Sequence, residues 1–327
     1  MPQSVLLKRR LQCSLLSMIA VISSGCTQLS FLVANVPASF GDYVRHQDVA
    51  YGPDARNTLD VYLPANSRNA PVVVFFHGGG WNSGDKSEYK FVGAALAARG
   101  CIAVLPNYRL YPKARLVDFM RDAARAVAWV YAQQGKWGTD GRNVFLMGHS
   151  AGAHIATLLA LDETYLENAG LDANKLRGVV GLAGPYDFIP FRYPYMFDLF
   201  GPEAEFARSQ PINYVRADAP PFFLLHGLKD TTVVPGNTEH LSAALSASGA
   251  RVMTKFYASA DHGDLIAPFS IPARKRLPVL DDVLLFMNDC MTVRTDATAV
   301  ARRQVADPGD GSGASNVALW GSIPSSD

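Results

Sequence analysis

The hydrophobic positions of this chain alternate between short, continuous apolar runs and longer stretches in which apolar residues recur every three or four positions. Short runs rich in Val, Ile and Phe are typical of buried strands, and the longer stretches are typical of amphipathic helices. The predicted strands cover residues 44–51, 59–63, 71–76, 101–106, 143–147, 178–182, 221–225 and 252–257. The predicted helices cover residues 89–99, 117–133, 151–161, 238–248 and 278–291.

This alternation of strands and helices predicts an α/β domain over residues 43–291, with a mostly parallel central sheet and helices on both faces. Ligands of such sheets bind at the carboxyl ends of the strands. Two segments break the pattern. Residues 185–215 form an insertion rich in aromatic residues and proline, with a helical pattern only near 203–207, and we expect a short lid. Residues 292–327 have little apolar periodicity and are predicted to be a disordered tail.

The N-terminus has the pattern of a targeting segment. The basic residues 8–10 precede a mostly apolar stretch, 11–22, which is too short to span a bilayer comfortably. Small residues then lead to Cys26, so residues 1–26 resemble a bacterial lipoprotein signal peptide in which Cys26 is lipidated. Ser23 departs from that signal, which usually has a Leu-like residue there, and ordinary signal cleavage stays open. We expect an exported protein, periplasmic or in the cell envelope, with a possible lipid anchor as its membrane contact.

Composition supports one large folded domain. Of 327 residues, 49% are hydrophobic and 18% charged, so a sizeable core can form. The formal net charge is +1, without a basic stripe, which gives no electrostatic case for a nucleic-acid partner. The four cysteines lack the paired spacing of metal ligands, and they are too few for a disulfide scaffold. Cys101 and Cys290 are predicted to be buried thiols.

Ser150 is the centre of a Gly-x-Ser-x-Gly pentapeptide, Gly148–Gly152, that directly follows a predicted strand and precedes a predicted helix. A sharp turn from strand to helix needs small residues beside a nucleophile, and the two glycines provide them. The turn also places the hydroxyl at the positive end of the helix dipole, where developing negative charge is stabilised. We interpret Ser150 as a nucleophile; an ordinary glycine-flanked turn is the alternative.

A run of three glycines follows the predicted strand 71–76, in the sequence His77–Trp81. Consecutive glycines let backbone N–H groups approach a ligand without obstruction by side chains. The N–H groups of Gly78 and Gly79, together with that of Ala151, are therefore candidates for an oxyanion hole. A phosphate-binding loop is disfavoured because no Lys and helix start follow at the required spacing.

The candidate base and acid come later in the chain. His262 follows the last predicted strand, and Asp230 follows the strand before it, in the order Ser, acid, His that this type of site requires. Asp261 and Asp264 are sequence neighbours of His262 and are better interpreted as turn residues. The other six histidines are less suitable because of their positions in the predicted elements: His46, His77, His149, His154, His226 and His240.

With these motifs in place, the region from Asp48 to Met291 resembles the esterase branch of the α/β-hydrolase superfamily that carries an HGGGW oxyanion loop. Its members include hormone-sensitive-lipase-like carboxylesterases, feruloyl-esterase-like enzymes, prenylcysteine methylesterases and kynurenine formamidases. Residues 107–110 and 211–214 also match that branch. The resemblance implies an α/β-hydrolase fold and a Ser150–Asp230–His262 triad.

The function expected from sequence is a serine carboxylesterase that acts on a small-molecule ester through an acyl-enzyme, without a metal or organic cofactor. Trp81, His149 and Tyr186 are candidate substrate contacts, the last at the start of the aromatic insertion. A formamidase or amidase would use the same catalytic residues and stays open. A non-catalytic binding module on the same fold is the alternative from a different class.

Overall fold

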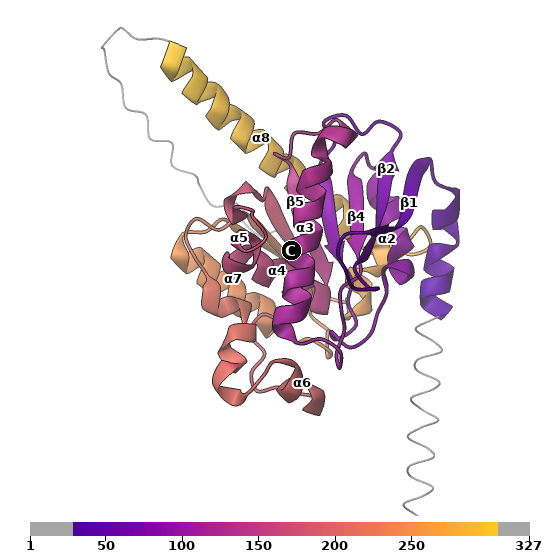
Figure 1. Ribbon diagram of the computed structural model, residues 1–327, viewed down its shortest axis with the longest axis vertical. Coiled ribbons are helices and arrows are strands. Elements are labelled where there is room, and N and C mark those ends of the chain that lie inside the picture. Colours follow the sequence, from indigo (N-terminus) through magenta and orange to yellow (C-terminus); the bar gives the residue numbers. More distant parts are fainter. Residues whose placement is uncertain (1–28, 307–327) are drawn as a thin grey trace, which may run out of the picture. The chain divides into compact units, whose positions relative to one another are not determined.

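Eight strands form one continuous sheet in the order β1-β2-β4-β3-β5-β6-β7-β8 (Figure 1). β1 and β2 are antiparallel, as are β2 and β4, and all other neighbours are parallel. All eight predicted strands are present, and they are β1 (Tyr43–Ala50), β2 (Thr58–Pro64), β3 (Val72–Phe76), β4 (Ile102–Pro106), β5 (Val144–His149), β6 (Gly178–Leu182), β7 (Phe222–Gly227) and β8 (Val252–Tyr257). This computed structural model describes residues 29–306, without the side chains of Ser39 and residues 293–306.

The helices include all five that the apolar periodicity predicted. The α-helices are α2 (Lys90–Ala97), α3 (Leu116–Trp137), α4 (Ala151–Leu161), α5 (Thr164–Glu167), α6 (Pro194–Leu199), α7 (Gly236–Ser248) and α8 (Val279–Ala306), and a further helical segment covers residues 29–35. Short 3₁₀ helices are η1 (Pro37–Phe40), η2 (Lys86–Tyr89), η3 (Ala173–Lys175), η4 (Glu203–Ser209), η5 (Pro211–Tyr214), η6 (Gly263–Leu265) and η7 (Ala267–Phe269). Among the described helices, none is long and apolar enough to cross a membrane.

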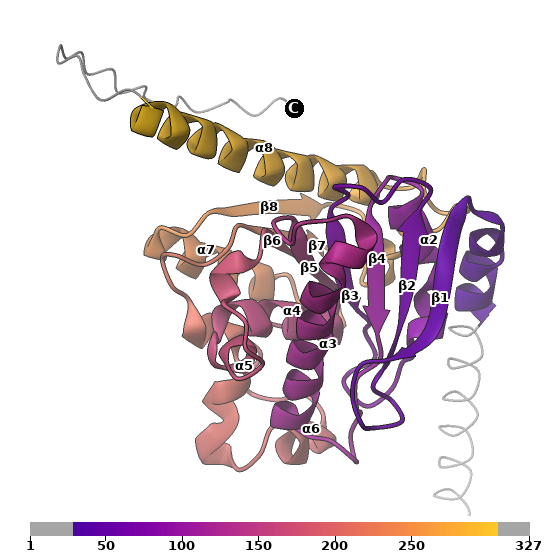
Figure 2. The same cartoon turned by 45° about the horizontal axis from the view of Figure 1, so that its top comes forward.

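Helices cover both faces of the sheet because both faces of its central strands are apolar. Alternate residues of a strand point to opposite faces. Val72 and Val74 belong to the core cluster that α3, α4 and α7 cover, and α3 crosses the front of the sheet in Figure 2. On the opposite face, α2 packs against β2 and β4, and Phe286 of α8 contacts Phe223 of β7. The predicted α/β fold is therefore confirmed.

The two ends of the chain differ in how far the structure describes them. The described residues divide into two units, the first ending at Cys290 and the second beginning at Met291. Residues 292–306 are helical, as the end of α8, which differs from the predicted disordered tail. Helical hydrogen bonds are local, and the Ala, Arg and Gln residues of this stretch have high helix propensity. Residues 307–327, and the signal segment 1–26 with Cys26, lie outside the described residues.

The insertion, residues 185–215, contains more helix than its sequence pattern indicated. The predicted pattern near 203–207 corresponds to η4, whereas α6 and η5 were not predicted. α6 is only six residues long, so it contains too few turns for a recognisable period. Phe191 packs against Phe200 and Phe206, with ring centroids 5.0 and 4.6 Å apart, and holds the insertion together.

The start of α4 lies against the carboxyl end of β3 with no room for a side chain. A Cβ added to Gly152 would lie 2.0 Å from the carbonyl oxygen of Phe76, and one added to Gly148 would lie 2.1 Å from the carbonyl oxygen of Gly152. Both neighbours are backbone atoms, which cannot rotate away. The two glycines of the pentapeptide are therefore required for β3, β5 and α4 to pack at this distance.

Replacing Gly152 with Ala is expected to lower the free energy of unfolding by about 2 kcal/mol or more, because the new methyl group overlaps the Phe76 carbonyl. Gly135→Ala is the matched control: Gly135 lies in α3 with no atom near its added Cβ, and this variant should gain about 0.4–1 kcal/mol. Urea unfolding followed by circular dichroism measures both. Equal stabilities for the two variants would contradict the close packing of β3 and α4.

Candidate active site

Ser150 joins β5 to α4 in a strained backbone conformation, with φ +56° and ψ −123°. This conformation costs a residue with a side chain about 1–3 kcal/mol of conformational free energy, so the surrounding structure must hold it in place. Parallel pairing of β5 with β3 and β6 fixes one side of the turn, and the Ser150 N–H donates to Leu182 O at 2.9 Å. The turn lifts Ser150 to the wall of a cavity, at the N-terminus of α4.

Asp230 and His262 are brought together from loops that follow neighbouring strands, β7 and β8. The Nδ1–H of His262 donates to Asp230 Oδ2 at 2.7 Å. The other oxygen of Asp230 accepts the N–H groups of Thr232 and Val233, each at 2.9 Å. This pairing holds the imidazole of His262 in the tautomer whose Nε2 can accept a proton.

The environment of Asp230 keeps its carboxylate ionised. Burial by itself would raise the pKa of Asp230, but hydrogen bonds from His226 and His262 outweigh it and hold the pKa below its usual range. His226 is fully buried; its Nε2–H points to Val233 O at 2.8 Å and to Asp230 Oδ2 at 3.3 Å. No role for His226 was predicted from the sequence; the available signal was its position at the end of a strand, four residues before Asp230.

His149, the residue before Ser150, connects the Ser150 turn to the loop of His262. Its Nε2–H donates to the backbone carbonyl of His262 at 3.0 Å, and the two rings lie 4.8 Å apart. Burial, and then the neighbouring His262, lower the pKa of His149 to about 3, so the ring is neutral at ordinary pH. The His149 side chain lies behind Ser150 and is not among the described residues that line the cavity.

The glycine loop after β3 adopts a conformation that few other residues tolerate. Gly79, Gly80 and Trp81 all have positive φ, at +118°, +57° and +61°. Two hydrogen bonds from the segment after β4 fix this loop. The Tyr108 hydroxyl donates to His77 O at 2.9 Å, and the Tyr111 N–H donates to Trp81 O at 2.9 Å. Residues 107–110, singled out in the sequence, thus support the glycine loop.

The glycine loop presents backbone N–H groups beside Ser150. Gly79, Gly80 and Ala151 line the cavity with Ser150, and within the described chain their N–H groups have no hydrogen-bond acceptor. Gly78 does not line it; a Cβ there would lie 3.1 Å from the carbonyl oxygen of His149 and 3.3 Å from the Cβ of Ser150. Of the three predicted oxyanion donors, Gly79 and Ala151 therefore lie at the cavity. Gly80, which was not predicted, lies there as well.

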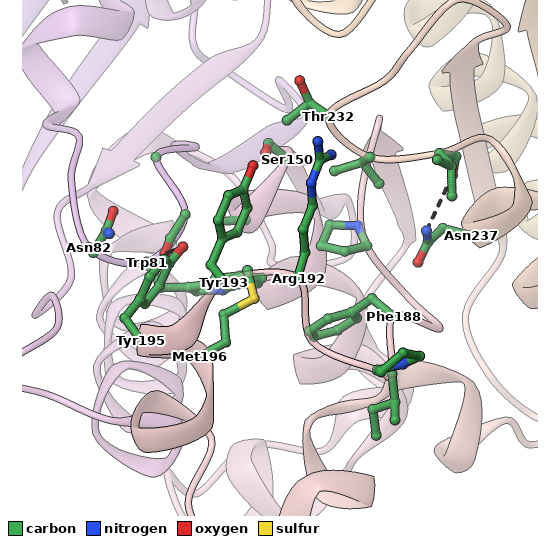
Figure 3. A pocket seen from close by; sticks show the side chains of 18 of the residues that line it. Trp81, Asn82, Ser150, Phe188, Arg192, Tyr193, Tyr195, Met196, Thr232 and Asn237 are labelled. Atoms are coloured by element: carbon green, nitrogen blue, oxygen red, sulfur yellow. Dashed lines mark hydrogen bonds between the residues drawn. The ribbon is translucent and has the colours of Figure 1, made fainter. Parts of the chain in front are cut away.

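The cavity has a volume of about 540 Å³ and is enclosed mainly by the glycine loop and the insertion. Figure 3 shows Trp81, Tyr193, Tyr195 and Arg192 arranged around the space beside Ser150. The Tyr195 hydroxyl donates to Gly80 O at 3.1 Å, and Arg192 Nη1 donates to the carbonyl oxygen of Thr231 at 2.8 Å. The insertion is therefore bound to both the glycine loop and the Asp230 loop.

Of the aromatic candidates, Trp81 lines the cavity and Tyr186 does not. Tyr186 is fully buried in the core, where its ring packs against Gly181 and Gly184. Trp81 donates its Nε1–H to His154 Nδ1 at 3.3 Å, and the opposite nitrogen of His154 donates to Ser209 O at 2.7 Å. Burial lowers the pKa of His154 to about 4, so this neutral ring links α4, the glycine loop and the insertion.

Comparison with known proteins places this arrangement in a family. The BD-FAE family model matches residues 59–245. The chain is 30% identical over 249 residues to the isoprenylcysteine alpha-carbonyl methylesterase of Arabidopsis thaliana, covering 69% of this chain and 58% of the relative. It is also 30% identical over 244 residues to the esterase LipQ of Mycobacterium tuberculosis, covering 67% of this chain and 58% of LipQ. The chain spans little more than half the length of these relatives.

Solved structures agree on the fold. Esterase B from Lactobacillus rhamnosis superposes with a TM-score of 0.71 at 20% identity, over 86% of this chain and 99% of that one. A truncated carbohydrate esterase from gut microbiota gives a TM-score of 0.66 at 19% identity, over 77% of this chain and 98% of that one. With the family model matching more than half of its residues, the chain belongs to the BD-FAE family and has the α/β-hydrolase fold.

Proposed function

We propose that this protein is a serine carboxylesterase with Ser150 as nucleophile, His262 as base and Asp230 as the acid that orients it. The observation that carries the proposal is the strained Ser150 turn, which opens onto a cavity also lined by unpaired backbone N–H groups. The His262–Asp230 pair is tied to that turn through His149. Relatives named as esterases and as a methylesterase add support.

The reaction proceeds in two steps. Ser150 Oγ attacks the ester carbonyl carbon while His262 Nε2 takes the hydroxyl proton, and that proton then passes to the departing alkoxide. Water next attacks the acyl-enzyme, losing a proton to His262, and the acid product leaves as Ser150 recovers its proton. The ionised Asp230 stabilises the imidazolium formed in each step.

The oxyanion of each tetrahedral intermediate is held by the N–H groups of Gly79, Gly80 and Ala151. All three residues line the cavity, and their N–H groups have no competing acceptor within the described chain. Each such donor is typically worth about 10²- to 10³-fold in rate. The N-terminus of α4 adds a favourable dipole at the same point.

The substrate is a carboxylic ester with an apolar or aromatic part. Phe188, Tyr193, Tyr195 and Met196 of the insertion, together with Trp81, form the wall that the acyl or alcohol group would contact. Such side chains supply apolar area, while backbone groups supply orientation. Hydrolysis of a formamide or amide would use the same catalytic residues. It differs from ester hydrolysis in the leaving group, which is an amine instead of an alcohol.

We further propose that the protein is exported to the periplasm or cell envelope and anchored through Cys26. The basic residues 8–10, the apolar stretch 11–22 and the small residues before Cys26 support this location.

Ser150→Ala should abolish labelling by a fluorophosphonate probe, because the reagent needs the activated hydroxyl. The parent protein should label and should hydrolyse aryl and alkyl esters from a panel that includes formamides and amides. Preference for a formamide would make the protein a formamidase instead. Equal labelling of parent and Ser150→Ala would contradict the nucleophile, and absence of all labelling and turnover would favour a binding module.

Asp230→Asn should lower kcat by about 10⁴-fold, because the amide cannot hold the tautomer or stabilise the imidazolium. Asp261→Asn is the matched control, since Asp261 is the residue before His262 and its carboxylate only accepts backbone N–H groups of Gly263 and Asp264. That change should leave kcat within about threefold, as is usual for surface substitutions. Comparable losses in the two variants would remove Asp230 from the mechanism.

Mass analysis of the N-terminus should show a mature chain that begins at Cys26 and carries a lipid adduct. Cys26→Ser is the control and should lack the adduct. A cleaved but unmodified N-terminus would contradict lipidation and leave export by an ordinary signal peptide. An intact residue 1 in protein recovered from the cell envelope would contradict cleavage.

A further inference from the structure

The segment that follows Cys26 presents an uncharged, apolar surface outside the active site. Leu29, Leu32, Val33 and Val36 recur at the spacing of one helix face, and their side chains are 53–60% exposed. Phe40, just beyond the helix, is 84% exposed. These five residues form what we call the apolar stripe. Soluble surfaces rarely gather large exposed apolar side chains in this way, so the stripe indicates a contact surface.

The opposite side of the same helix is firmly attached to the catalytic unit. Phe31 packs against Tyr89, with ring centroids 5.1 Å apart. Asn35 Nδ2 donates to the carbonyl oxygen of Glu88 at 2.9 Å, and Asn35 Oδ1 accepts the Phe91 N–H at 3.0 Å. The outward direction of the apolar stripe is therefore set by packing on its inner side, rather than by a loose end of the chain.

Basic residues lie beside this surface. Ile271, 58% exposed, and Arg274 share a small cavity with residues 34–41. Lys275 and Arg276 follow directly, both exposed, and neither forms an ion pair with any residue that the structure describes. Asp42 is the exposed acidic residue that follows the stripe. An apolar face flanked by unpaired cations matches the interface of a bilayer that contains anionic lipids.

We propose that the apolar stripe docks on the surface of an anionic phospholipid membrane, with Arg274–Arg276 contacting the headgroups. A second copy of the chain fits less well, because a stable dimer buries about 20–30 residues on each partner and the stripe contains five. Position in the chain favours a membrane as well, since the stripe begins three residues after Cys26, the proposed site of the anchor. The proposal goes beyond the esterase activity and does not depend on it.

The membrane contact also complements the anchor energetically. A lipid anchor attaches the chain to the bilayer at its terminus alone, and interfacial binding scales with the apolar area that is buried. A rigid apolar face would add such area and would hold the catalytic unit in one orientation on the bilayer.

The test uses a chain that begins at Thr27, which retains every described residue and lacks both the apolar leader and Cys26. It should float with vesicles of phosphatidylethanolamine and phosphatidylglycerol, and less with phosphatidylcholine vesicles. Leu32→Ser with Val36→Ser should lower the partition coefficient by at least about tenfold. Met253→Ser with Leu285→Ser is the matched control, because both side chains are exposed on other elements, β8 and α8, and it should bind like the parent.

Lys275→Gln with Arg276→Gln should remove the preference for phosphatidylglycerol while leaving residual binding. Hydrolysis of a soluble ester, or the thermal unfolding midpoint if no ester is hydrolysed, shows that each variant is folded. Equal vesicle binding by the Leu32/Val36 and Met253/Leu285 variants would overturn the proposal. So would a dimer in sedimentation that the Leu32/Val36 change dissociates, with no vesicle binding by the parent, because the occupant would then be a second copy.

Discussion

The close approach of α4 to the carboxyl end of β3 is the constraint on which the rest of the site depends. Because two glycines allow backbone to meet backbone there, the chain can turn from β5 into α4 within one residue, and Ser150 takes the strained conformation. The same contact brings the glycine loop after β3 next to the start of α4. The proposed nucleophile and the proposed oxyanion donors are thus positioned by the same close packing of α4 against β3.

Three buried histidines extend this arrangement outward. His149 links the Ser150 turn to the His262 loop, His154 links α4 to Trp81 and the insertion, and His226 supports Asp230. Burial lowers the pKa of His149 and of His154, so these two rings are neutral at ordinary pH and can join segments without a buried charge. The site therefore uses histidine chiefly as a connector, and only His262 for proton transfer in the proposed mechanism.

The fold and the proposed triad were predictable because their signals are local in sequence. Short runs of apolar residues indicated the strands. Asp230 and His262 follow successive strands whose ends meet at one edge of the sheet. Which glycine N–H groups face the cavity was not predictable, since it depends on the positive φ of Gly79, and glycine accepts either sign. The connecting roles of His149, His154 and His226 rest on partners that are distant in sequence or loop-dependent, which no periodicity encodes.

The hydrogen bond from the Tyr195 hydroxyl to Gly80 O has a consequence for how the proposed esterase could change its substrate. Tyr195 belongs to the insertion, which forms a wall of the cavity, and it is hydrogen-bonded to the glycine loop that would stabilise the oxyanion. Remodelling the insertion to admit a different ester therefore also shifts the backbone whose alignment sets the rate. For the proposed esterase, substrate range and catalytic rate would therefore be coupled, and a change of specificity would have to preserve that hydrogen bond or replace it.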